Sequence, residues 1–422
     1  MAGPRYPLPM LGARRRPFDC RWFACLLSVL ATGCESPPNS AGAAGVAGAG
    51  NDPSERGFAP VPVPRDHHRL VRLDLERVER STLRSADTAG TARVSLETFE
   101  AIVVESPFRE VLPSWNLDVP DGAHALVELR VRRESDELWS PWLSVGEWGD
   151  ERLVTDAVRP RVTEFDGGRV ATDMVRADVD LDAAQMRVIG LMREDGLMRE
   201  DGLLREDGLL REDGPGSGAV DPPRATVAVR RATLCLSVGR VPVAAVARPR
   251  IASLPIELDV PFHSQRAEDP GIAGRICSPT SVAMVLQFHG VEAAVDDVAR
   301  RAYDPRHDIY GNWPRNVQTA WTYGVAGHLE RFDDWSAVRS CFERGLPLVV
   351  SIGVEPGQLT GAPYSRTTGH LIVLRGFDAA GDLLVNDPAA IDGERGRAVY
   401  ARAELEQVWL ARGGTAYVFE PR

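Results

Sequence analysis

Hydrophobic and polar residues alternate in short runs over roughly residues 66–248. The runs "ALVELRVRRE" and "ATVAVRRATLCLSV" place an apolar side chain at nearly every second position, and Pro, Gly and Asp separate such runs. This period of two is typical of strands with one face against a core and the other in water. The pattern predicts inward positions at Val127, Leu129, Val131, Val227, Val229, Leu234 and Leu236, and outward positions at Glu128, Arg130 and Arg132. We therefore expect an all-β domain of the antiparallel sandwich or jelly-roll type.

Four copies of a hexapeptide occupy residues 190–214, "GLMREDGLMREDGLLREDGLLREDG". Their period fits neither a helix nor strand alternation, and they lie between the strand-like runs "MRVI" and "ATVAVRR". The favoured interpretation is an expanded hairpin loop. A metal-binding β-roll is the alternative because each copy carries Glu-Asp-Gly, although such arrays use longer repeats with more carboxylates.

The pattern changes near "ARPRIASLP", residues 247–255, and residues 249–422 mix helical and strand-like segments. A helix is expected from Pro279 to about His289, with further helical segments near 293–303 and 335–345. Strands are expected at "IELDVPF", "LPLVVSIGV", "HLIVLRGF" and "DLLVNDP", and Pro, Gly and Asn make "YGNWPRN" a loop. The fold class is therefore multidomain, with an N-terminal all-β domain at 66–248 and a C-terminal α+β domain at 249–422.

The first 34 residues resemble a secretory signal. Arg14–Arg16 and Arg21 precede an apolar run from Trp22 to Ala31, which is shorter than the ~20 residues that a bilayer-spanning helix needs. The ending "LATGC" resembles a bacterial lipobox, which implies that Cys34 carries a lipid. Ordinary signal-peptidase cleavage and a buried N-terminal helix are the alternatives.

Residues 35–65 are rich in Pro, Gly, Ala, Ser and Asn and hold few large apolar side chains. Burial in such a segment cannot offset the entropy of ordering its backbone, so we expect a disordered tether. Together with the predicted lipid anchor, the tether predicts a protein held at a bacterial membrane, periplasmic or on the cell surface. If the lipid is absent, the protein is expected to be secreted.

Charge and cysteine content narrow the possible functions. The formal net charge of −11 and the pI near 5.4 argue against nucleic acid as a partner, because binding to phosphates needs a basic face. Of the six cysteines, Cys20 and Cys25 leave with the signal and Cys34 takes the lipid. Cys235, Cys277 and Cys341 remain, so at least one thiol stays free in an oxidising compartment. No CxxC or Cys/His spacing indicates zinc, and no metal is expected.

Four tryptophans crowd one region, from "PSWNLDVP" to "LWSPWLSVGEWG". Exposed rings there would form a platform on which sugars stack, whereas buried rings would belong to the core. The core is the favoured interpretation for Trp115, Trp139, Trp142 and Trp148, and contact with a glycan or the cell wall is the alternative.

"GRICSPTSVAMVLQFHG", residues 274–290, begins a helix near Cys277. Ser278 can cap that helix, and Pro279 fits a first turn, where a missing N–H costs nothing. Helical spacing then predicts that Val282, Val285, Leu286 and His289 share an inward face. A thiol at a helix N-terminus faces the positive end of the helix dipole, which lowers its pKa. Cys277 is therefore a candidate nucleophile.

An activated cysteine also needs a base, a group that orients the base, and donors for the oxyanion. His370 opens the apolar run "HLIVLRGF", where an imidazole needs a partner, and Asp387 ends the next run. The intervening turn "DAAGD" predicts an antiparallel hairpin that brings both residues to one end of the sheet. Gln265, a short loop before Cys277, is a candidate oxyanion donor. His263 is the main rival among the other histidines because it lies close to Gln265.

This order of residues resembles the papain-like cysteine peptidases of the bacteriocin-processing, double-glycine (C39-like) type. The resemblance covers about 255–422 through "VPFHSQ", "CSPTSVAMVL", "GNWP", "GLPLVVSI", "TGHLIVLRGF" and "VNDP". It implies an α+β papain-like domain in which Cys277 is the nucleophile, His370 the base, Asp387 its orienting carboxylate and Gln265 the oxyanion donor. Many relatives have Cys-Gly-Pro where this chain has Cys-Ser-Pro. The upstream region looks like the β-rich N-terminal domain of such peptidases.

The same resemblance implies that "YGNWP" lines the substrate cleft, with Tyr310, Asn312 and Trp313 as substrate-binding residues; a loop packed on the helix is the alternative. Such a peptidase needs no cofactor. The sequence therefore predicts an envelope-anchored or secreted cysteine peptidase acting on a peptide or protein. An amidase or transpeptidase of cell-wall peptides, and a non-catalytic binding protein with a papain-like scaffold, remain as alternatives.

Overall fold

The computed structural model describes residues 67–87, 90–153, 161–193, 226–239 and 255–421. All of these belong to one compact unit of the chain. The predicted signal and lipobox, Cys34, the tether and most of the hexapeptide repeat lie outside the described residues. Within the described residues, no helix has the length and apolar character that a membrane span requires.

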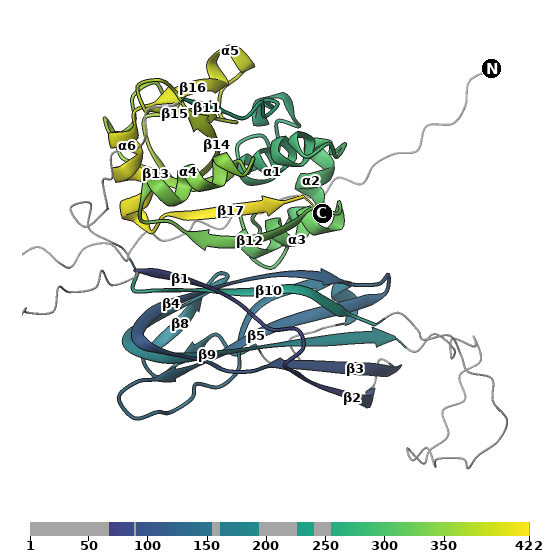
Figure 1. Cartoon of the computed structure of the whole chain (residues 1–422). Coiled ribbons are helices and arrows are strands. Elements are labelled where there is room, and N and C mark those ends of the chain that lie inside the picture. The colour runs from purple at the N-terminus through teal and green to yellow at the C-terminus, as the bar shows by residue number, and fades with distance from the viewer. Residues whose placement is uncertain (1–66, 88–89, 154–160, 194–225, 240–254, 422) are drawn as a thin grey trace, which may run out of the picture. The chain divides into compact units, whose positions relative to one another are not determined.

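The β-rich part of the chain, residues 68–237, forms an antiparallel sheet of ten described strands (Figure 1). The central order is β1-β10-β4-β9-β3-β2, and β5 to β8 attach through β9. The strands are β1 His68–Arg72, β2 Val78–Asp87, β3 Gly90–Phe99, β4 Ile102–Asp118, β5 Ala123–Arg133, β6 Leu143–Gly149, β7 Glu164–Phe165, β8 Gly168–Ala171, β9 Met174–Arg193 and β10 Ala228–Ser237, with a 3-10 turn η1 Glu151–Leu153.

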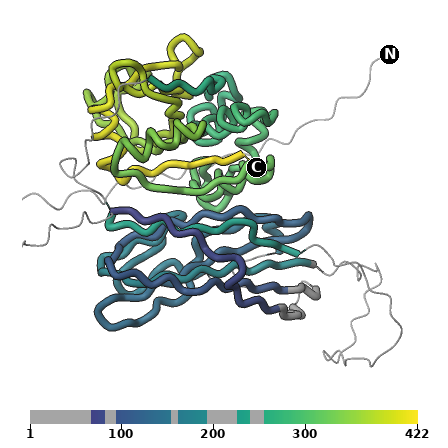
Figure 2. The backbone as a smooth tube through the Cα atoms, in the orientation of Figure 1, coloured from purple at the N-terminus to yellow at the C-terminus, as the bar shows by residue number. Residues whose placement is uncertain are grey.

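Two long strands organise this sheet in place of the two separate sheets of a sandwich. β4 has 17 residues and β9 has 20, and their register shifts twice along their common ladder. Such irregularities bend and twist strands, so one strand can pair with different partners along its length. β9 pairs in this way with β3, β4, β5 and β8. The backbone trace shows β1 beside β10, so the start and the end of the β-rich part lie side by side (Figure 2).

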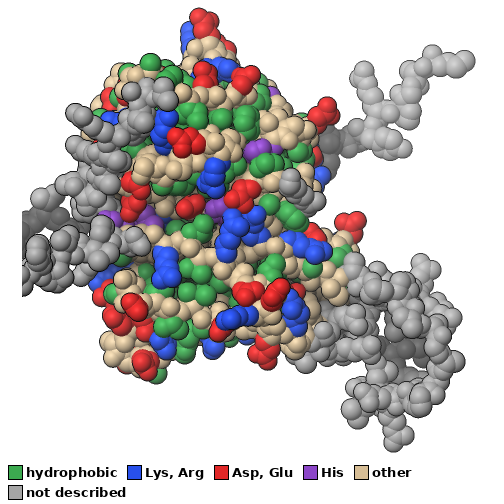
Figure 3. Space-filling model, viewed as in Figure 1, with side chains coloured by type: hydrophobic (Ala, Val, Ile, Leu, Met, Phe, Trp, Pro, Cys, Tyr) green, Lys and Arg blue, Asp and Glu red, His purple; other side chains and the backbone are tan. Residues whose placement is uncertain are grey.

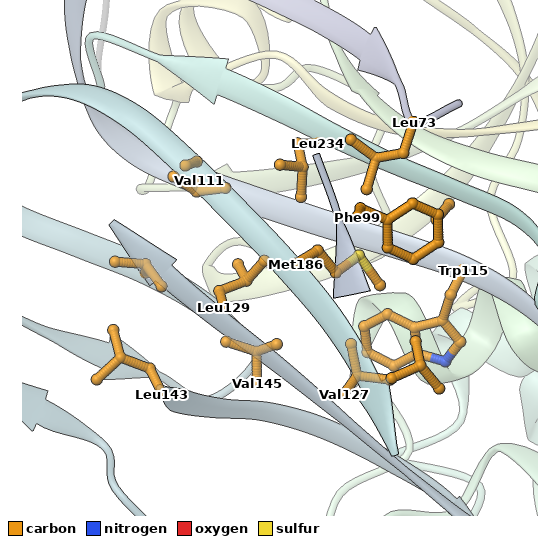
Figure 4. Close-up of a cluster of buried hydrophobic side chains, with 14 of the residues drawn as sticks. Leu73, Phe99, Val111, Trp115, Val127, Leu129, Leu143, Val145, Met186 and Leu234 are labelled. Carbon is orange, nitrogen blue, oxygen red and sulfur yellow. The ribbon is translucent and has the colours of Figure 1, made fainter. Parts of the chain in front are cut away.

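The predicted inward positions of the first run are buried: Val127, Leu129 and Val131 are at most 1% exposed. In β10 a register shift between Val229 and Arg231 moves the inward positions from odd to even residue numbers. Both halves of the second run therefore reach the core, as Figure 4 shows for Leu234. One outward prediction is wrong. Glu128 is buried, and the guanidinium of Arg187, 2.6 Å away, compensates its charge.

The tryptophan prediction is correct only for Trp115, which is 2% exposed and lies among the buried side chains of Figure 4. Trp139, Trp142 and Trp148 are partly exposed. Each stacks with arginine, so the apolar ring faces are covered by cations instead of by the core. The guanidinium-to-ring distances are 4.7 Å for Arg130–Trp139, 4.8 Å for Arg130–Trp142, 4.2 Å for Arg187–Trp142 and 4.8 Å for Arg315–Trp148.

The strands that flank the hexapeptide repeat are not a hairpin, contrary to the sequence-based interpretation. β9 and β10 do not pair, because β4 lies between them in the sheet order. The repeat also begins inside a strand, since β9 extends to Arg193 and pairs there with β3. Glycine suits position 190 of the ladder, because a Cβ there would meet the side chains of Ser95 and Val227.

The mixed part of the chain, residues 255–421, is built on a second antiparallel sheet of seven described strands, in the order β12-β17-β13-β14-β15-β16 with β11 beside β14. Its strands are β11 Ile256–Glu257, β12 Ala326–Arg331, β13 Leu348–Val354, β14 Thr367–Phe377, β15 Leu383–Asn386, β16 Arg397–Tyr400 and β17 Thr415–Glu420. Its helices are η3 Gln265–Ala267, α1 Cys277–Phe288, α2 Val295–Ala302, α3 Trp313–Thr322, α4 Trp335–Glu343, α5 Gly393–Gly396, α6 Arg402–Val408 and η4 Leu410–Arg412.

Helix α3 corrects the prediction of a loop over "YGNWPRN". Asn312 is its N-cap, and the side chain accepts a hydrogen bond from the Arg315 backbone N–H at 3.1 Å. Pro314 falls in the first turn, where its missing N–H breaks no helical bond. The loop therefore ends at Asn312, and Trp313 opens the helix.

Helix α1 is buried on almost every side, which differs from the single inward face that was predicted. Every residue from Ser278 to Leu286 is buried. The helix packs on β14, and its apolar side chains share a cluster with Leu112, Met174 and Cys235 from the β-rich part. The two parts of the chain are thus joined by a common core.

Candidate active site

Helix α1 and strand β14 bring Cys277 and His370 together. Cys277 is the first residue of α1, and His370 lies near the start of β14. The two elements pack along each other, with Ser281 Oγ donating to the Leu371 carbonyl at 3.2 Å. The ring of His370 lies near enough to the Cys277 thiol to lower the pKa of that thiol, and the thiol in turn helps to raise the pKa of the ring.

The predicted β14–β15 hairpin is present and brings Asp387 behind the ring. The strands pair antiparallel, and the turn between them holds Gly381 at a φ of +86°. Asp387 directly follows β15, and its Oδ1 lies 2.8 Å from His370 Nε2. Because Nε2 is used in this bond, Nδ1 is the ring nitrogen available to Cys277.

Two tyrosines that the sequence analysis missed hold the same carboxylate. The hydroxyls of Tyr364 and Tyr400 donate to Asp387 Oδ2 at 2.9 and 2.8 Å, and the Ala389 backbone N–H donates to Oδ1 at 3.0 Å. The Tyr364 ring also meets the His370 ring edge-on, with centroids 4.9 Å apart. Tyr400 lies at the site because β16 pairs with β15. No local sequence pattern predicts that pairing.

The charges of the three groups support one another. Burial by itself would raise the pKa of the Cys277 thiol, but the hydrogen bond and charge of His370 outweigh it and lower that pKa. Burial would lower the pKa of His370, but Asp387 and Cys277 together raise it to about 10. Burial would raise the pKa of Asp387, but His370 lowers it. This arrangement favours a thiolate–imidazolium pair.

Accessibility separates Cys277 from the other described thiols. Cys277 is partly exposed, whereas Cys235 and Cys341 are buried, and all three are free. Burial raises the pKa of Cys235 to about 11 and also raises that of Cys341. His370 is 6% exposed and Asp387 fully buried, so Cys277 is the most exposed residue of the three. Cys277 is therefore the described thiol suited to nucleophilic attack.

Gln265 is anchored beside the Asp387 loop. Its backbone N–H donates to the Pro388 carbonyl at 2.9 Å, and its side-chain Nε2 donates to the Ala273 carbonyl at 2.7 Å. The acceptor at Ala273 fixes the amide orientation, and Oε1 has no hydrogen-bond partner in the protein. Nε2 carries a second N–H, so an oxyanion role is compatible with this placement.

The backbone at the start of α1 offers further donors. Ile276 is the N-cap and supplies no side-chain hydrogen bond, so the first N–H groups of the helix are not capped. The predicted cap by Ser278 is wrong. Its hydroxyl lies 2.9 Å from the Tyr417 hydroxyl, because position 278 is inside the helix and faces the buried strand β17.

Of the predicted substrate-binding residues, Tyr310 and Trp313 are partly buried and pack against the same apolar cluster as Cys277. Arg275, two residues before the cysteine, lies 5.4 Å from the centre of the Tyr310 ring. Asn312 is buried and acts as the cap of α3, which gives it a structural role. Substrate contact by these three residues stays a prediction.

The rival histidine lies elsewhere. His263 Nε2 pairs with Gln287 Oε1 at 2.8 Å, near the far end of α1. Ten residues separate Gln287 from Cys277 along this helix, a rise of about 15 Å. Among the described residues, no group of three or more His, Cys, Asp and Glu side chains is placed to hold a metal ion.

Two family models match separate segments of the chain. Residues 257–417 match the Peptidase C39-like family, and residues 64–203 match the Peptidase C39 N-terminal domain. The first segment contains Gln265, Cys277, His370 and Asp387. Each match covers less than half of the chain, so what they show is that two segments are similar to C39-type peptidase domains.

Two solved structures are similar to the chain: a C39-like peptidase from Bacillus anthracis, and a double glycine motif protease from an AMS/PCAT transporter in complex with the leader peptide. Each is 20% identical to this chain; the similarity covers 40% of this chain and 98% of the other, with TM-scores of 0.32 and 0.29 respectively. None of the curated proteins matches the chain.

Proposed function

We propose that this protein is a cysteine peptidase that hydrolyses peptide bonds through Cys277, His370 and Asp387. The observation that carries the proposal is a partly exposed cysteine whose thiol pKa is lowered by a buried imidazole, with a carboxylate held by two tyrosines behind that imidazole. The family of the matched segment supports the same chemistry.

In the proposed reaction the Cys277 thiolate attacks the carbonyl carbon of the substrate amide. The uncapped N–H groups at the start of α1 and the free N–H of Gln265 stabilise the oxyanion. His370 gives its proton to the leaving amine, and a water molecule, deprotonated by the same ring, then hydrolyses the thioester. Asp387 keeps the ring oriented with Nδ1 toward the sulfur.

Activity on a peptide library tests this proposal directly. We expect Cys277→Ala to abolish cleavage and Gln265→Ala to reduce kcat/KM by roughly 10²-fold to 10³-fold, the usual loss for one oxyanion donor. Cys341→Ala, which removes a buried thiol remote from the site in sequence, is the control and should retain cleavage. Cleavage that persists in Cys277→Ala would refute the proposal.

The substrate class can be separated from the chemistry. Mass spectrometry of peptide products and of purified peptidoglycan, each incubated with the wild type and with Cys277→Ala, distinguishes a peptidase from an amidase or transpeptidase of wall peptides. Products from peptides alone support the peptidase. Products from peptidoglycan alone would indicate that the same three residues act in an amidase or transpeptidase. The absence of any Cys277-dependent product would favour a non-catalytic protein.

We also propose that the protein is anchored in the cell envelope by a lipid on Cys34. The support is the Arg-rich and apolar segment that ends in "LATGC". Detergent-phase partitioning of the full chain tests the anchor: the wild type should enter the detergent phase, and Cys34→Ser should remain in the aqueous phase. Equal partitioning of the two proteins would leave secretion without a lipid as the better account.

A further inference from the structure

A cavity of about 260 Å³ lies where the β-rich part meets the loop before α3. Its walls come from β4, β5, β6, residues 161–172 and residues 304–315, and Cys277, His370 and Asp387 are not among its lining residues. This volume is just below the ~300–1,000 Å³ typical of small-molecule sites. The cavity can therefore hold a compact organic molecule, and it is separate from the proposed active site.

The two carboxylates in the wall of this cavity already have partners. Glu147 pairs with Arg161 and lies 3.5 Å from His124, and despite burial these groups lower its pKa to about 2. Asp304 accepts hydrogen bonds from His307 and Asn312, both at 2.8 Å. Both carboxylates are thus ionised and have hydrogen-bond or ion-pair partners within the protein, so neither needs a bound cation.

The wall also contains donors that lack acceptors. Trp115, 2% exposed, lines the cavity, and its indole Nε1 has no hydrogen-bond partner in the protein. Arg315 Nε is likewise buried without a partner, while its Nη1 donates to the Glu147 carbonyl at 3.3 Å. With Arg161 and Arg306, three arginines face two carboxylates. The wall of the cavity therefore holds N–H groups that no acceptor in the protein uses.

We propose that this cavity binds a small molecule that carries a carboxylate, whose oxygens accept hydrogen bonds from Trp115 Nε1 and Arg315. A planar guanidinium matches the two oxygens of a carboxylate, and Arg315 is held for this task by stacking on Trp148 at 4.8 Å. The remaining space is lined by Val127, Val145 and Val170, which suits a short apolar substituent. This proposal does not depend on peptidase activity.

Calorimetric titration of the purified full chain tests the site with three probes: N-acetylalanine, its uncharged amide, and inorganic phosphate. We expect saturable binding of the carboxylate and at least tenfold weaker binding of the amide, as the loss of a charged hydrogen-bond pair predicts. Trp115→Phe keeps the ring but removes the N–H, and Arg315→Gln removes the charge. Each should weaken N-acetylalanine binding about tenfold.

Matched controls are Trp139→Phe and Arg301→Gln. Trp139 is a partly exposed, arginine-stacked tryptophan, and Arg301 lies 5.1 Å from the centre of the Tyr323 ring; neither lines the cavity. Both should bind like the wild type. Equal binding of acid and amide, tighter binding of phosphate, or no binding of any probe would overturn the proposal.

Arg306→Gln covers the case in which the buried variants do not fold, since Arg306 lines the cavity but is exposed. We expect this substitution to weaken N-acetylalanine binding about threefold, as for a partly screened charge. Unchanged affinity in a folded Arg306→Gln protein, as judged by circular dichroism, would also count against the site.

Discussion

The carboxylate of Asp387 accepts four hydrogen bonds, from His370, the Ala389 backbone, Tyr364 and Tyr400. Each donor stabilises the charged form, and together they leave the side chain a single orientation. In the tyrosines, burial and the neighbouring carboxylate raise both hydroxyl pKa values far above the ordinary range, so they stay protonated donors. Asp387, which holds the ring of His370, is thus itself held in one orientation.

Tyr364→Phe and Tyr400→Phe remove one donor each and are expected to lower kcat/KM about tenfold, the loss of one charged hydrogen bond. The carboxylate then carries a less compensated charge, so the pKa of His370 should rise and the alkaline limb of the pH profile should move upward. Steady-state kinetics against pH measure both effects. Tyr323→Phe, which removes a hydroxyl 2.8 Å from Asp297, is the control, and an equal loss there would disprove a specific role.

The pH dependence of thiol alkylation tests the ion pair without a substrate. Thiolate appears as pH rises through the pKa of Cys277, which His370 lowers below its ordinary value, so alkylation should already be fast near neutral pH. In His370→Ala the pKa should rise, and the rate near neutral pH should fall at least tenfold. After alkylation with iodoacetamide, peptide mass spectrometry measures the modified fraction of Cys277 separately from that of the other cysteines. Identical profiles in the two proteins would exclude the pair.

At the residue scale, Cys277, His370 and Asp387 could be chosen as candidates from the sequence because each stands out locally: a cysteine before a helix, an imidazole in an apolar strand, and an aspartate at a strand end. Their contacts in the structure agree with the predicted proximity. Tyr364 and Tyr400 were missed because tyrosines are ordinary in a loop and in a short strand. Only the pairing of β15 with β16 and the path of the preceding loop bring them to Asp387.

At the element scale, the start of α3 is held by a residue 140 positions away. Asp173, between β8 and β9, accepts a hydrogen bond from the Trp313 backbone N–H at 2.8 Å, in addition to the local cap by Asn312. An anion near the first N–H groups of a helix is stabilised by the helix dipole. Burial nevertheless outweighs this donor and raises the pKa of Asp173 to about 6.

This raised pKa gives a signed prediction for stability. The folded protein binds the proton of Asp173 more tightly than the unfolded chain, so Asp173 costs stability as pH rises from its ordinary value through about 6. Asp173→Asn removes that titration. The melting temperature of the variant relative to the wild type should therefore increase between pH 5 and pH 8, corresponding to about 1.4 kcal/mol, because about one pKa unit of the shift lies above pH 5.

Thermal melts at several pH values measure this difference. Asp334→Asn is the control, since Asp334 caps α4 through the Ser336 and Ala337 backbone N–H groups but is partly exposed. This variant measures what the loss of a helix cap by itself does to the melting temperature. A flat difference for Asp173→Asn would contradict the assigned cause.

Local patterns predicted elements better than they predicted pairing. The β14–β15 hairpin was accessible because a five-residue turn joins two apolar runs. The start of α3 could also have been predicted, because Asn312 is a typical N-cap and Pro314 a typical first-turn residue. A loop was predicted instead, because glycine and proline are also typical of loops. The sequence could not show that β9 and β10 are unpaired. The strand that separates them in the sheet is β4, which comes much earlier in the chain.

At the scale of the whole molecule, every basic side chain among the 49 Lys and Arg positions is an arginine. Arginine stacks on aromatic rings and forms bidentate pairs that lysine cannot form. The Arg–Trp stacks and the buried Arg187–Glu128 pair use these properties. On the face shown in Figure 3, acidic and basic side chains are interspersed.

The β-rich part also protects an edge of the second sheet. β12 is the last strand of that sheet, and an open edge invites pairing with another chain. Side chains of β4 occupy its donors: Asn116 Oδ1 accepts from the Gly327 N–H at 3.1 Å, and Ser114 Oγ accepts from the Leu329 N–H at 3.0 Å. Gln318 of α3 adds two bonds to the Leu117 backbone, at 2.8 and 2.9 Å. The mixed part therefore relies on the β-rich part for polar groups that would otherwise lie open.

We therefore expect residues 255–422, produced alone, to melt at a lower temperature than residues 62–422 and to self-associate through β12. Removing the β-rich part uncovers the Gly327 and Leu329 donors together with the apolar cluster that Leu112 and Cys235 complete. Thermal melts measure the stability and light scattering measures the self-association. The double variant Ser114→Ala and Asn116→Ala in the longer chain should have a lower melting temperature but should not self-associate, because the β-rich part still covers β12. A monomeric fragment as stable as the longer chain would show that the mixed part folds independently of this contact.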